Sequence, residues 1–147
     1  MTNDLFLAIL AMDSYNRGYD PGMEVTRAQI GNATLGLRST DSAAGTPGGQ
    51  AAGFYAISYT WNGQTVISYR GTDDVLGLGD GASDLWRGWI TGAGHLVPGG
   101  QAQLAVDFYN NVTGANVIAG ASGSGAILTG HSLGGGLAGF IGSFTQS

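Results

Sequence analysis

The chain has 147 residues, 43% of them hydrophobic, and this length and composition suit one folded domain with a buried core. Ten acidic residues outnumber five basic ones, and the resulting net charge of −5 argues against nucleic acid or an anionic membrane surface as a partner. Cysteine is absent, which excludes disulfides, thiolate metal sites and a cysteine nucleophile.

The N-terminal segment contains an apolar stretch at residues 5–12. It lacks the basic flank and the small-residue cleavage site of a signal peptide, and it is too short to span a bilayer. The sequence leaves the compartment open between the cytoplasm and export by a route that needs no signal peptide. The stretch predicts a helix with one face in the core. Its capping candidates are Thr2, Asn3 and Asp4, and its expected core face consists of Leu5, Ile9 and Met12.

The middle of the chain changes from loop-like to strand-like composition. Residues 20–52 are rich in Gly, Thr, Ser and Ala, and STDSAAGTPGGQAAG is the clearest loop. Two β-branched and aromatic runs follow, at 53–60 and 64–70, on either side of Asn62-Gly63. Because both turn residues tolerate positive φ, this pattern predicts a β-hairpin.

Residues 71–100 are glycine-rich and predict a long loop with one short helix near Trp86 and Trp89. Within this loop, GLGDGASD contains the Gly-Asp pattern of calcium-binding repeats. A single copy is far shorter than the arrays that bind the ion, so no metal site is predicted.

The last third of the chain predicts a helix at 99–112 and a strand at 126–130, with 115–120 ambiguous. Strands thus alternate with helices after an initial hairpin, and this order predicts an α/β fold. The expected apolar side of the helix consists of Leu104, Ala105, Phe108 and Val112.

The motif Gly130-His131-Ser132-Leu133-Gly134 follows the last predicted strand and precedes a glycine-rich apolar segment. Such a motif is a weak signal in a chain with 28 glycines, but the order strand, sharp turn, helix is what a serine nucleophile needs. An elbow of this kind strains the serine backbone and requires small flanking residues. We therefore predict that Ser132 is a nucleophile and that Gly130 and Gly134 are the small residues of its elbow. The alternative is a strand-turn-helix with an incidental serine.

An oxyanion hole needs two hydrogen-bond donors beside the serine. One is the backbone N–H of the residue after the nucleophile, here Leu133, and the other comes from the loop after an earlier strand. The strand 65–70 leads directly into RGTDD, in which we predict that Thr72 is the second donor. The alternative is an ordinary turn at the end of a strand.

The segments VISYRGTDD and ILTGHSLGGGLAGF together resemble the class 3 lipases, the fungal-lipase-like branch of the α/β-hydrolases. The resemblance covers the chain from about Ala52 to its end and implies a single, truncated α/β-hydrolase-like domain, 1–147, whose sheet is incomplete and has flanking helices. It implies Ser132 as nucleophile, Thr72 and Leu133 as oxyanion-hole residues, and neither metal nor cofactor. It also implies a lid at 74–97. Large apolar residues of such a lid either contact an acyl chain or pack inside the protein. Here they are Leu76, Leu78, Leu85, Trp86 and Trp89.

The resemblance further implies an aspartate and a histidine after the serine, but no residue after Ser132 fits either role. His131 adjoins the nucleophile and is expected to pack beneath the turn, and His95 lies in a loop that could pass over the site. The acids Asp73, Asp74 and Asp107 are better explained as turn, cap and surface groups. We therefore expect the base and the acid on polypeptide that this chain does not contain. The open edge of strand 126–130 is expected to be covered by a complementary C-terminal segment or by a second copy in a homo-oligomer.

The predicted activity is hydrolysis of a carboxylic ester, such as an acylglycerol or a related lipid ester, by a lipase or carboxylesterase. Ser132 would attack the ester carbonyl while an absent histidine accepts its proton. Two alternatives stay open. The same motif occurs in carrier-protein acyltransferases, which move the acyl group to a thiol, and a folded module without catalysis also fits.

Overall fold

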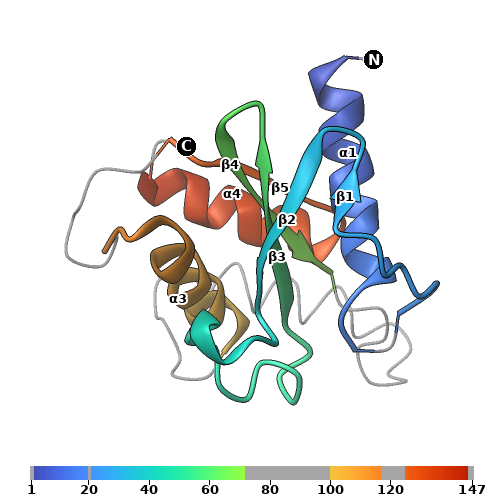
Figure 1. Ribbon diagram of the computed structural model, residues 1–147. Helices are drawn as coiled ribbons and strands as arrows, with labels where there is room; N and C mark the ends of the chain where they lie inside the picture. Colours follow the sequence, from blue (N-terminus) through green and yellow to red (C-terminus); the bar gives the residue numbers. More distant parts are fainter. Residues whose placement is uncertain (1, 20, 72–99, 117–124, 146–147) are drawn as a thin grey trace.

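The computed structural model describes residues 2–19, 21–71, 100–116 and 125–145. The fold is α/β, as predicted, with a five-stranded mixed sheet against which three helices pack (Figure 1). The strands, in the order β1-β2-β3-β4-β5, are β1 (Gln29–Ile30), β2 (Ala33–Arg38), β3 (Tyr55–Trp61), β4 (Gln64–Arg70) and β5 (Ile127–Gly130). The helices are α1 (Asn3–Asp13), α3 (Gln101–Thr113) and α4 (Leu133–Thr145), with one-turn 3-10 helices η1 (Ser14–Asn16) and η2 (Ser42–Ala44).

Strands β3 and β4 form the predicted hairpin. They pair antiparallel from Tyr55–Arg70 to Trp61–Gln64, so the connection consists of two residues. Those residues, Asn62 and Gly63, have φ values of +51° and +77°. Positive φ at both positions matches the right-handed twist of the flanking strands, which is the physical reason that Asn-Gly predicts this turn.

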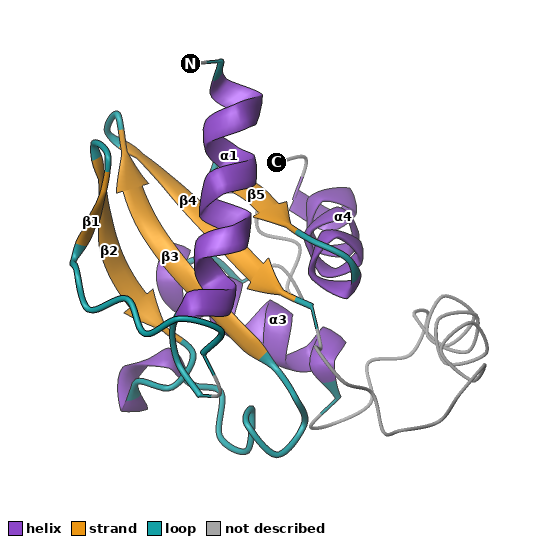
Figure 2. Ribbon diagram, turned by 90° about the vertical axis from the view of Figure 1, so that its right-hand side faces the viewer, coloured by secondary structure: helices purple, strands orange, loops and turns teal. Residues whose placement is uncertain are grey.

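The sheet is covered on both faces, as Figure 2 shows for α1 in front and α3 behind. Because side chains alternate along a strand, β3 and β4 supply both layers of the core. The layer under α1 contains Phe6, Leu10, Ala33, Tyr55, Ile57, Tyr59, Trp61 and Val66. The layer under α3 and α4 contains Ala44, Phe54, Ala56, Ile67, Tyr69, Leu104, Ala105, Val106, Phe108, Tyr109, Ala126, Leu137, Ala138 and Ile141.

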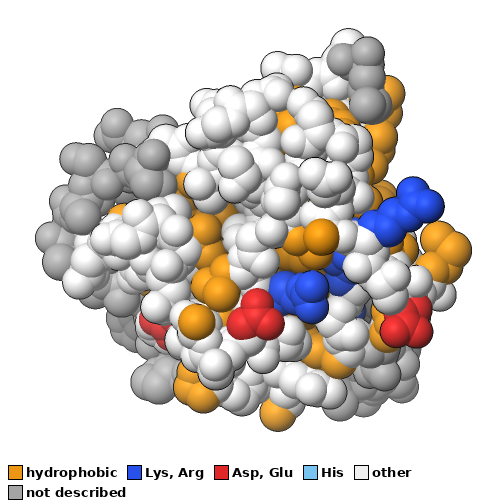
Figure 3. All heavy atoms as spheres, in the orientation of Figure 1, with side chains coloured by type: hydrophobic (Ala, Val, Ile, Leu, Met, Phe, Trp, Pro, Cys, Tyr) orange, Lys and Arg blue, Asp and Glu red, His pale blue; other side chains and the backbone are white. Residues whose placement is uncertain are grey.

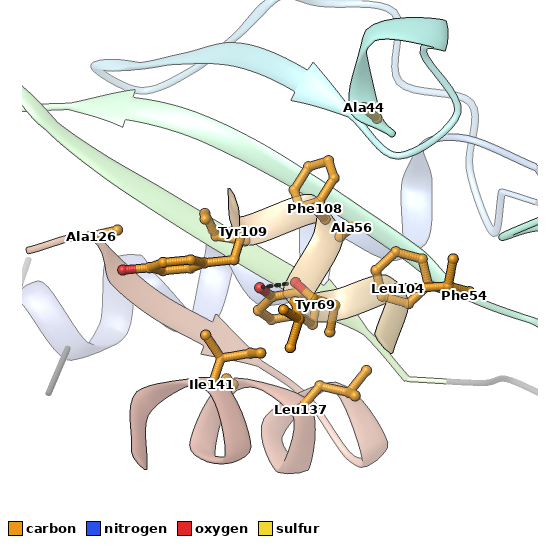
Figure 4. Packing of buried hydrophobic residues seen from close by; sticks show 14 residues of the cluster. Ala44, Phe54, Ala56, Tyr69, Leu104, Phe108, Tyr109, Ala126, Leu137 and Ile141 are labelled. Atoms are coloured by element: carbon orange, nitrogen blue, oxygen red, sulfur yellow. Dashed lines mark hydrogen bonds between the residues drawn. The ribbon is translucent and has the colours of Figure 1, made fainter. Parts of the chain in front are cut away.

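Both C-terminal helices bury apolar faces, and α3 buries the face that the sequence indicated. In α3, Leu104 and Phe108 are buried against the sheet, and Leu137 and Ile141 do the same in α4. Figure 4 shows these side chains gathered around Tyr69, whose hydroxyl donates to the Ala105 carbonyl at 3.2 Å. The predicted helical periodicity is confirmed here.

Helix α1 begins after the predicted cap Thr2, whose hydroxyl accepts from the Leu5 N–H, but it buries a different face from the expected one. Leu5, Ile9 and Met12 are 55%, 37% and 52% exposed, and hydrophobic atoms line the margin of Figure 3 where α1 lies. Its buried residues are Phe6, Leu10, Ala11 and Asp13. Because the stretch is apolar on nearly all sides, its periodicity does not select a face. None of the helices in the described part of the chain has the length and apolar character needed to cross a membrane.

Strands β1 and β2 lie in the segment whose composition indicated loop. Pairing with β3 stabilises β2, and a bulge between Leu35 and Arg38 interrupts the ladder. At the interruption, the Ser58 hydroxyl accepts from the Leu37 N–H at 2.8 Å. Tertiary contacts thus override a weak local preference for strand. The following segment, 39–53, is loop as predicted, apart from the single turn of η2.

A buried polar network joins the end of α1 to the sheet. The Asp13 carboxylate accepts from Arg17 Nε in a buried ion pair, and it accepts from the Tyr59 hydroxyl at 2.7 Å. Arg17 also donates to the Val25 carbonyl at 3.0 Å. Asp13 and Arg17 lie on either side of η1, so the network fixes that turn relative to β3.

We expect Tyr59→Phe to lower the free energy of unfolding by about 2 kcal/mol, since a hydrogen bond to a charged group is lost inside the core. Tyr69→Phe is the matched control, because its hydroxyl donates to a neutral carbonyl, and a loss of about 1 kcal/mol is expected there. Urea unfolding at neutral pH measures both. Equal losses in the two variants would contradict a special contribution of the Asp13 network.

Candidate active site

The carboxyl ends of β4 and β5 lie side by side. The two strands run parallel, and their last paired residues are Tyr69 and Gly130. Gly71 follows β4, while His131 and Ser132 follow β5. The residues that follow these two strands therefore meet at the edge of the sheet where α/β proteins place their sites.

Ser132 has the backbone conformation of a sharp turn. Its φ of +56° lies in the left-handed region, which costs a residue with a side chain about 1 kcal/mol. Among the described residues, the only other non-glycine with positive φ is Asn62, where the hairpin requires it. Ser132 stands exposed between the end of β5 and the first residue of α4. Strained residues of this kind concentrate at functional sites.

Gly130 and Gly134 lie where strand and helix approach most closely. A Cβ on Gly130 would lie 2.4 Å from the carbonyl carbon of Gly134, and one on Gly134 would lie 1.9 Å from the carbonyl oxygen of Tyr69. Both obstacles are backbone atoms, so no side chain fits at either position. The small residues that the sequence predicted around the serine are therefore required by packing.

The first turn of α4 faces the elbow. The N–H groups of Gly134 and Gly135 donate to the carbonyls of His131 and Ser132, both at 3.0 Å. Leu133 precedes them as the first residue of the helix, where an N–H has no acceptor inside the helix. The partial positive charge at the N-terminus of the helix strengthens the attraction of this N–H for an anion. The turn can therefore stabilise an anion beside Ser132.

Tyr15, on η1, also reaches this edge of the sheet. Its hydroxyl accepts from the Gly71 N–H at 3.1 Å and lies 3.3 Å from both the carbonyl oxygen and Nδ1 of His131. A Cβ on Gly71 would lie 2.7 Å from the Tyr15 hydroxyl and 3.2 Å from the Ser132 Cβ, so these groups share one small space. No sequence pattern marks Tyr15, because it is 116 residues from His131 along the chain.

His131 does not pack beneath the turn, contrary to the expectation. Its side chain is exposed, and its ring meets the Tyr15 ring edge to face with the centroids 5.9 Å apart. The space beneath the elbow is taken by Gly134 against the Tyr69 backbone, which leaves no room for an imidazole. The imidazole therefore lies on Tyr15 at the surface.

Several predicted site residues lie outside the described residues: Thr72, Asp73, Asp74, His95 and the lid 74–97. Asp107 is described, and it accepts from Gln103 within α3 at 2.8 Å. In the described parts of the chain, no three His, Asp or Glu side chains gather in a group that could hold a metal ion.

Comparison of the chain with protein-family models, with curated proteins and with solved structures found no match.

Proposed function

We propose that this chain carries the nucleophile of a serine carboxylic-ester hydrolase of the α/β-hydrolase type, similar to the class 3 lipases. One observation supports this most strongly: the left-handed Ser132 stands exposed between a parallel strand and a helix N-terminus. A turn that only reverses the chain does not require a serine here, since glycine adopts a positive φ without strain. The strained conformation does serve a nucleophile that must be presented at the edge of a sheet.

In the proposed reaction, the Ser132 hydroxyl oxygen attacks the carbonyl carbon of an acyl ester and its proton passes to a base. The bond to the alcohol breaks, an acyl-serine forms, and water then releases the acid. The N–H groups of Leu133 and Thr72 are the proposed donors to the oxyanion. A donor of this type contributes about 10²–10³ to turnover.

The proposal places the base and the acid outside the described residues. Among those residues, no imidazole or carboxylate hydrogen-bonds to Ser132, and His131 Nδ1 faces Tyr15 instead. A groove of about 590 Å³ runs along β5, which pairs only with β4 in the described sheet. We propose that a complementary segment or a second copy covers this edge. The groove is lined by Leu128, Thr129, Gly130, Gly135, Ala138, Gly139, Gly142 and Ser143.

The proposed substrate is an acyl ester, in particular a lipid ester. A fluorophosphonate tests the nucleophile, because it forms a stable adduct only with an activated serine. We expect an adduct on Ser132 when imidazole is added as a substitute base, slow labelling without imidazole, and no adduct in Ser132→Ala. Mass spectrometry of peptides locates the adduct, and the other serines of the chain are internal controls.

Labelling of Ser132 no faster than that of the other serines, with or without imidazole, would contradict the proposal and favour a module without catalysis. Assays with a p-nitrophenyl ester and with a thioester plus a thiol acceptor then separate the two enzymatic alternatives. Hydrolysis is expected to exceed transfer. Preferential transfer to the thiol would indicate an acyltransferase.

A further inference from the structure

We propose that Tyr15 is a positioning residue of this site, whose hydroxyl ties the end of β4 to the serine elbow. The inference rests on the proposed function for its catalytic consequence, but the tie itself is a property of the fold.

The hydrogen bonds of the Tyr15 hydroxyl lie just beyond the point where the pairing of β4 with β5 ends. Tyr69 and Gly130 are the last paired residues of β4 and β5. Two residues after Tyr69, the Gly71 N–H donates to the Tyr15 hydroxyl at 3.1 Å instead of to β5. The hydroxyl has one proton, so it donates to either the carbonyl oxygen or Nδ1 of His131, each 3.3 Å away. One oxygen atom thus bridges the two chain segments beyond their last ladder pair.

The main chain of Tyr15 is held in place by the residues on either side of η1. It lies within η1, between Asp13 and Arg17, which form the buried ion pair. The Tyr59 hydroxyl donates to Asp13 at 2.7 Å and thereby fixes this turn to the centre of the sheet. Because its main chain is anchored, the Tyr15 hydroxyl reaches the site with little conformational freedom to lose.

A second contact joins the segment after η1 to the end of β4. The Arg70 guanidinium donates to the Tyr19 carbonyl at 2.9 Å and lies over the Tyr19 ring, 4.4 Å from its centroid. Arg70 is 4% exposed and is the last residue of β4. Residues 15–19 therefore hold the end of β4 at two consecutive residues, Arg70 through its side chain and Gly71 through its amide.

The hydrogen-bonded link through Tyr15 lies beside Ser132, so it affects the geometry of the proposed nucleophile. Gly71 can approach the elbow only because it lacks a Cβ, which would lie 2.8 Å from the His131 carbonyl oxygen and 3.2 Å from the Ser132 Cβ. Without the hydroxyl, the hydrogen-bonded link between Gly71 and His131 would be lost. Displacements of about 1 Å at a reacting group lower a rate about 10²-fold. Tyr15 therefore sets the geometry of Ser132 without touching the substrate.

Tyr15→Phe tests the inference, because it removes the hydroxyl and keeps the ring against His131. With the fluorophosphonate and imidazole, we expect the maximal labelling rate of Ser132 to fall about 10- to 100-fold while the probe concentration at half-maximal rate is unchanged. Tyr69→Phe is the matched control. This variant loses the Tyr69 hydroxyl, which donates to the Ala105 carbonyl on the other face of β4. We expect its Ser132 to be labelled at the same rate as in the parent.

A second measurement does not depend on activity. In the unsubstituted protein, the Gly71 amide should be protected from hydrogen exchange, and in Tyr15→Phe its proton resonance should shift upfield and its exchange should accelerate. An unprotected Gly71 amide, or one unaffected by Tyr15→Phe, would overturn the inference. If Ser132 labels in the parent, an unchanged labelling rate in Tyr15→Phe would also overturn it. Absence of Ser132 labelling in the parent together with a shifted Gly71 amide would refute the proposed function alone.

Discussion

Replacing Gly134 by alanine is expected to remove at least about 4 kcal/mol of folding free energy, which is a large share of the stability of a typical domain. The new Cβ would lie 1.9 Å from the Tyr69 carbonyl oxygen and 2.9 Å from the Arg70 carbonyl carbon. Both atoms belong to the main chain of β4, so neither can rotate away. Relief would require α4 to leave the sheet, and the buried contacts of Leu137 and Ile141 would be lost with it.

Gly139→Ala is the matched control on the same helix. Gly139 is exposed, and a Cβ there would meet nothing within 4 Å. Because glycine inside a helix is less favourable than alanine, this variant should gain about 0.5–1 kcal/mol. Urea unfolding followed by circular dichroism measures both changes. A Gly134→Ala protein within about 1 kcal/mol of the parent would show that α4 does not approach β4 this closely.

The second large effect is a loss of stability at alkaline pH. Burial raises the pKa of Tyr55 from its usual 10.0 to about 12, against the opposing effect of the charges on Arg38, Arg17 and Arg70. Burial also raises the pKa of Tyr59, and the Asp13 carboxylate adds to the increase. For Tyr69 the cause is again burial, followed by Tyr109. All three phenol groups therefore keep their protons in the folded state at a pH where the unfolded chain loses them.

Because the unfolded state releases these protons first, stability is fully present below about pH 10 and falls as the pH rises above it. Each raised tyrosine costs about 1.4 kcal/mol per pH unit until its folded pKa is reached, so Tyr55 alone costs about 3 kcal/mol by about pH 12. The chain contains neither lysine nor cysteine, so tyrosines are the side chains that titrate in this range. Urea unfolding between about pH 8 and pH 11.5 should therefore show a steep decline.

Tyr55→Phe provides the control for this decline. No described residue hydrogen-bonds to the Tyr55 hydroxyl, so its removal should not lower stability at neutral pH. Above about pH 10 the variant should lose stability less steeply than the parent, by about 1.4 kcal/mol per pH unit. A free energy of unfolding that stays constant up to about pH 11 in the parent would contradict the burial of these phenol groups.

The close approach of α4 to the sheet also relates stability to the proposed chemistry. Glycines at 130 and 134 allow α4 to begin directly after Ser132, and this places the amide of Leu133 beside the serine. The same packing excludes an imidazole from beneath the turn, so His131 lies at the surface against Tyr15. Packing thus places Ser132 directly before the first N–H of α4, which is the donor proposed for the oxyanion.

The sequence by itself determined those elements whose conformation depends on nearby residues. Asn62-Gly63 specifies its hairpin because both residues accept positive φ, and the structure has it at that position. The helical spacing of Leu104 and Phe108 predicted α3 and its buried face correctly. The elbow was likewise readable, because a strand, a small-residue turn and a helix follow one another within a few residues of Ser132.

Only the tertiary structure decided features that depend on contacts between distant segments. The buried face of α1 is one, since a helix that is apolar on nearly every side buries whichever face the sheet offers. Strand β2 is another, because pairing with β3 stabilises a segment of weak strand preference. The place of Tyr15 beside Gly71 and His131 is the third, and it follows from the buried pair of Asp13 and Arg17 together with the parallel pairing of β4 with β5.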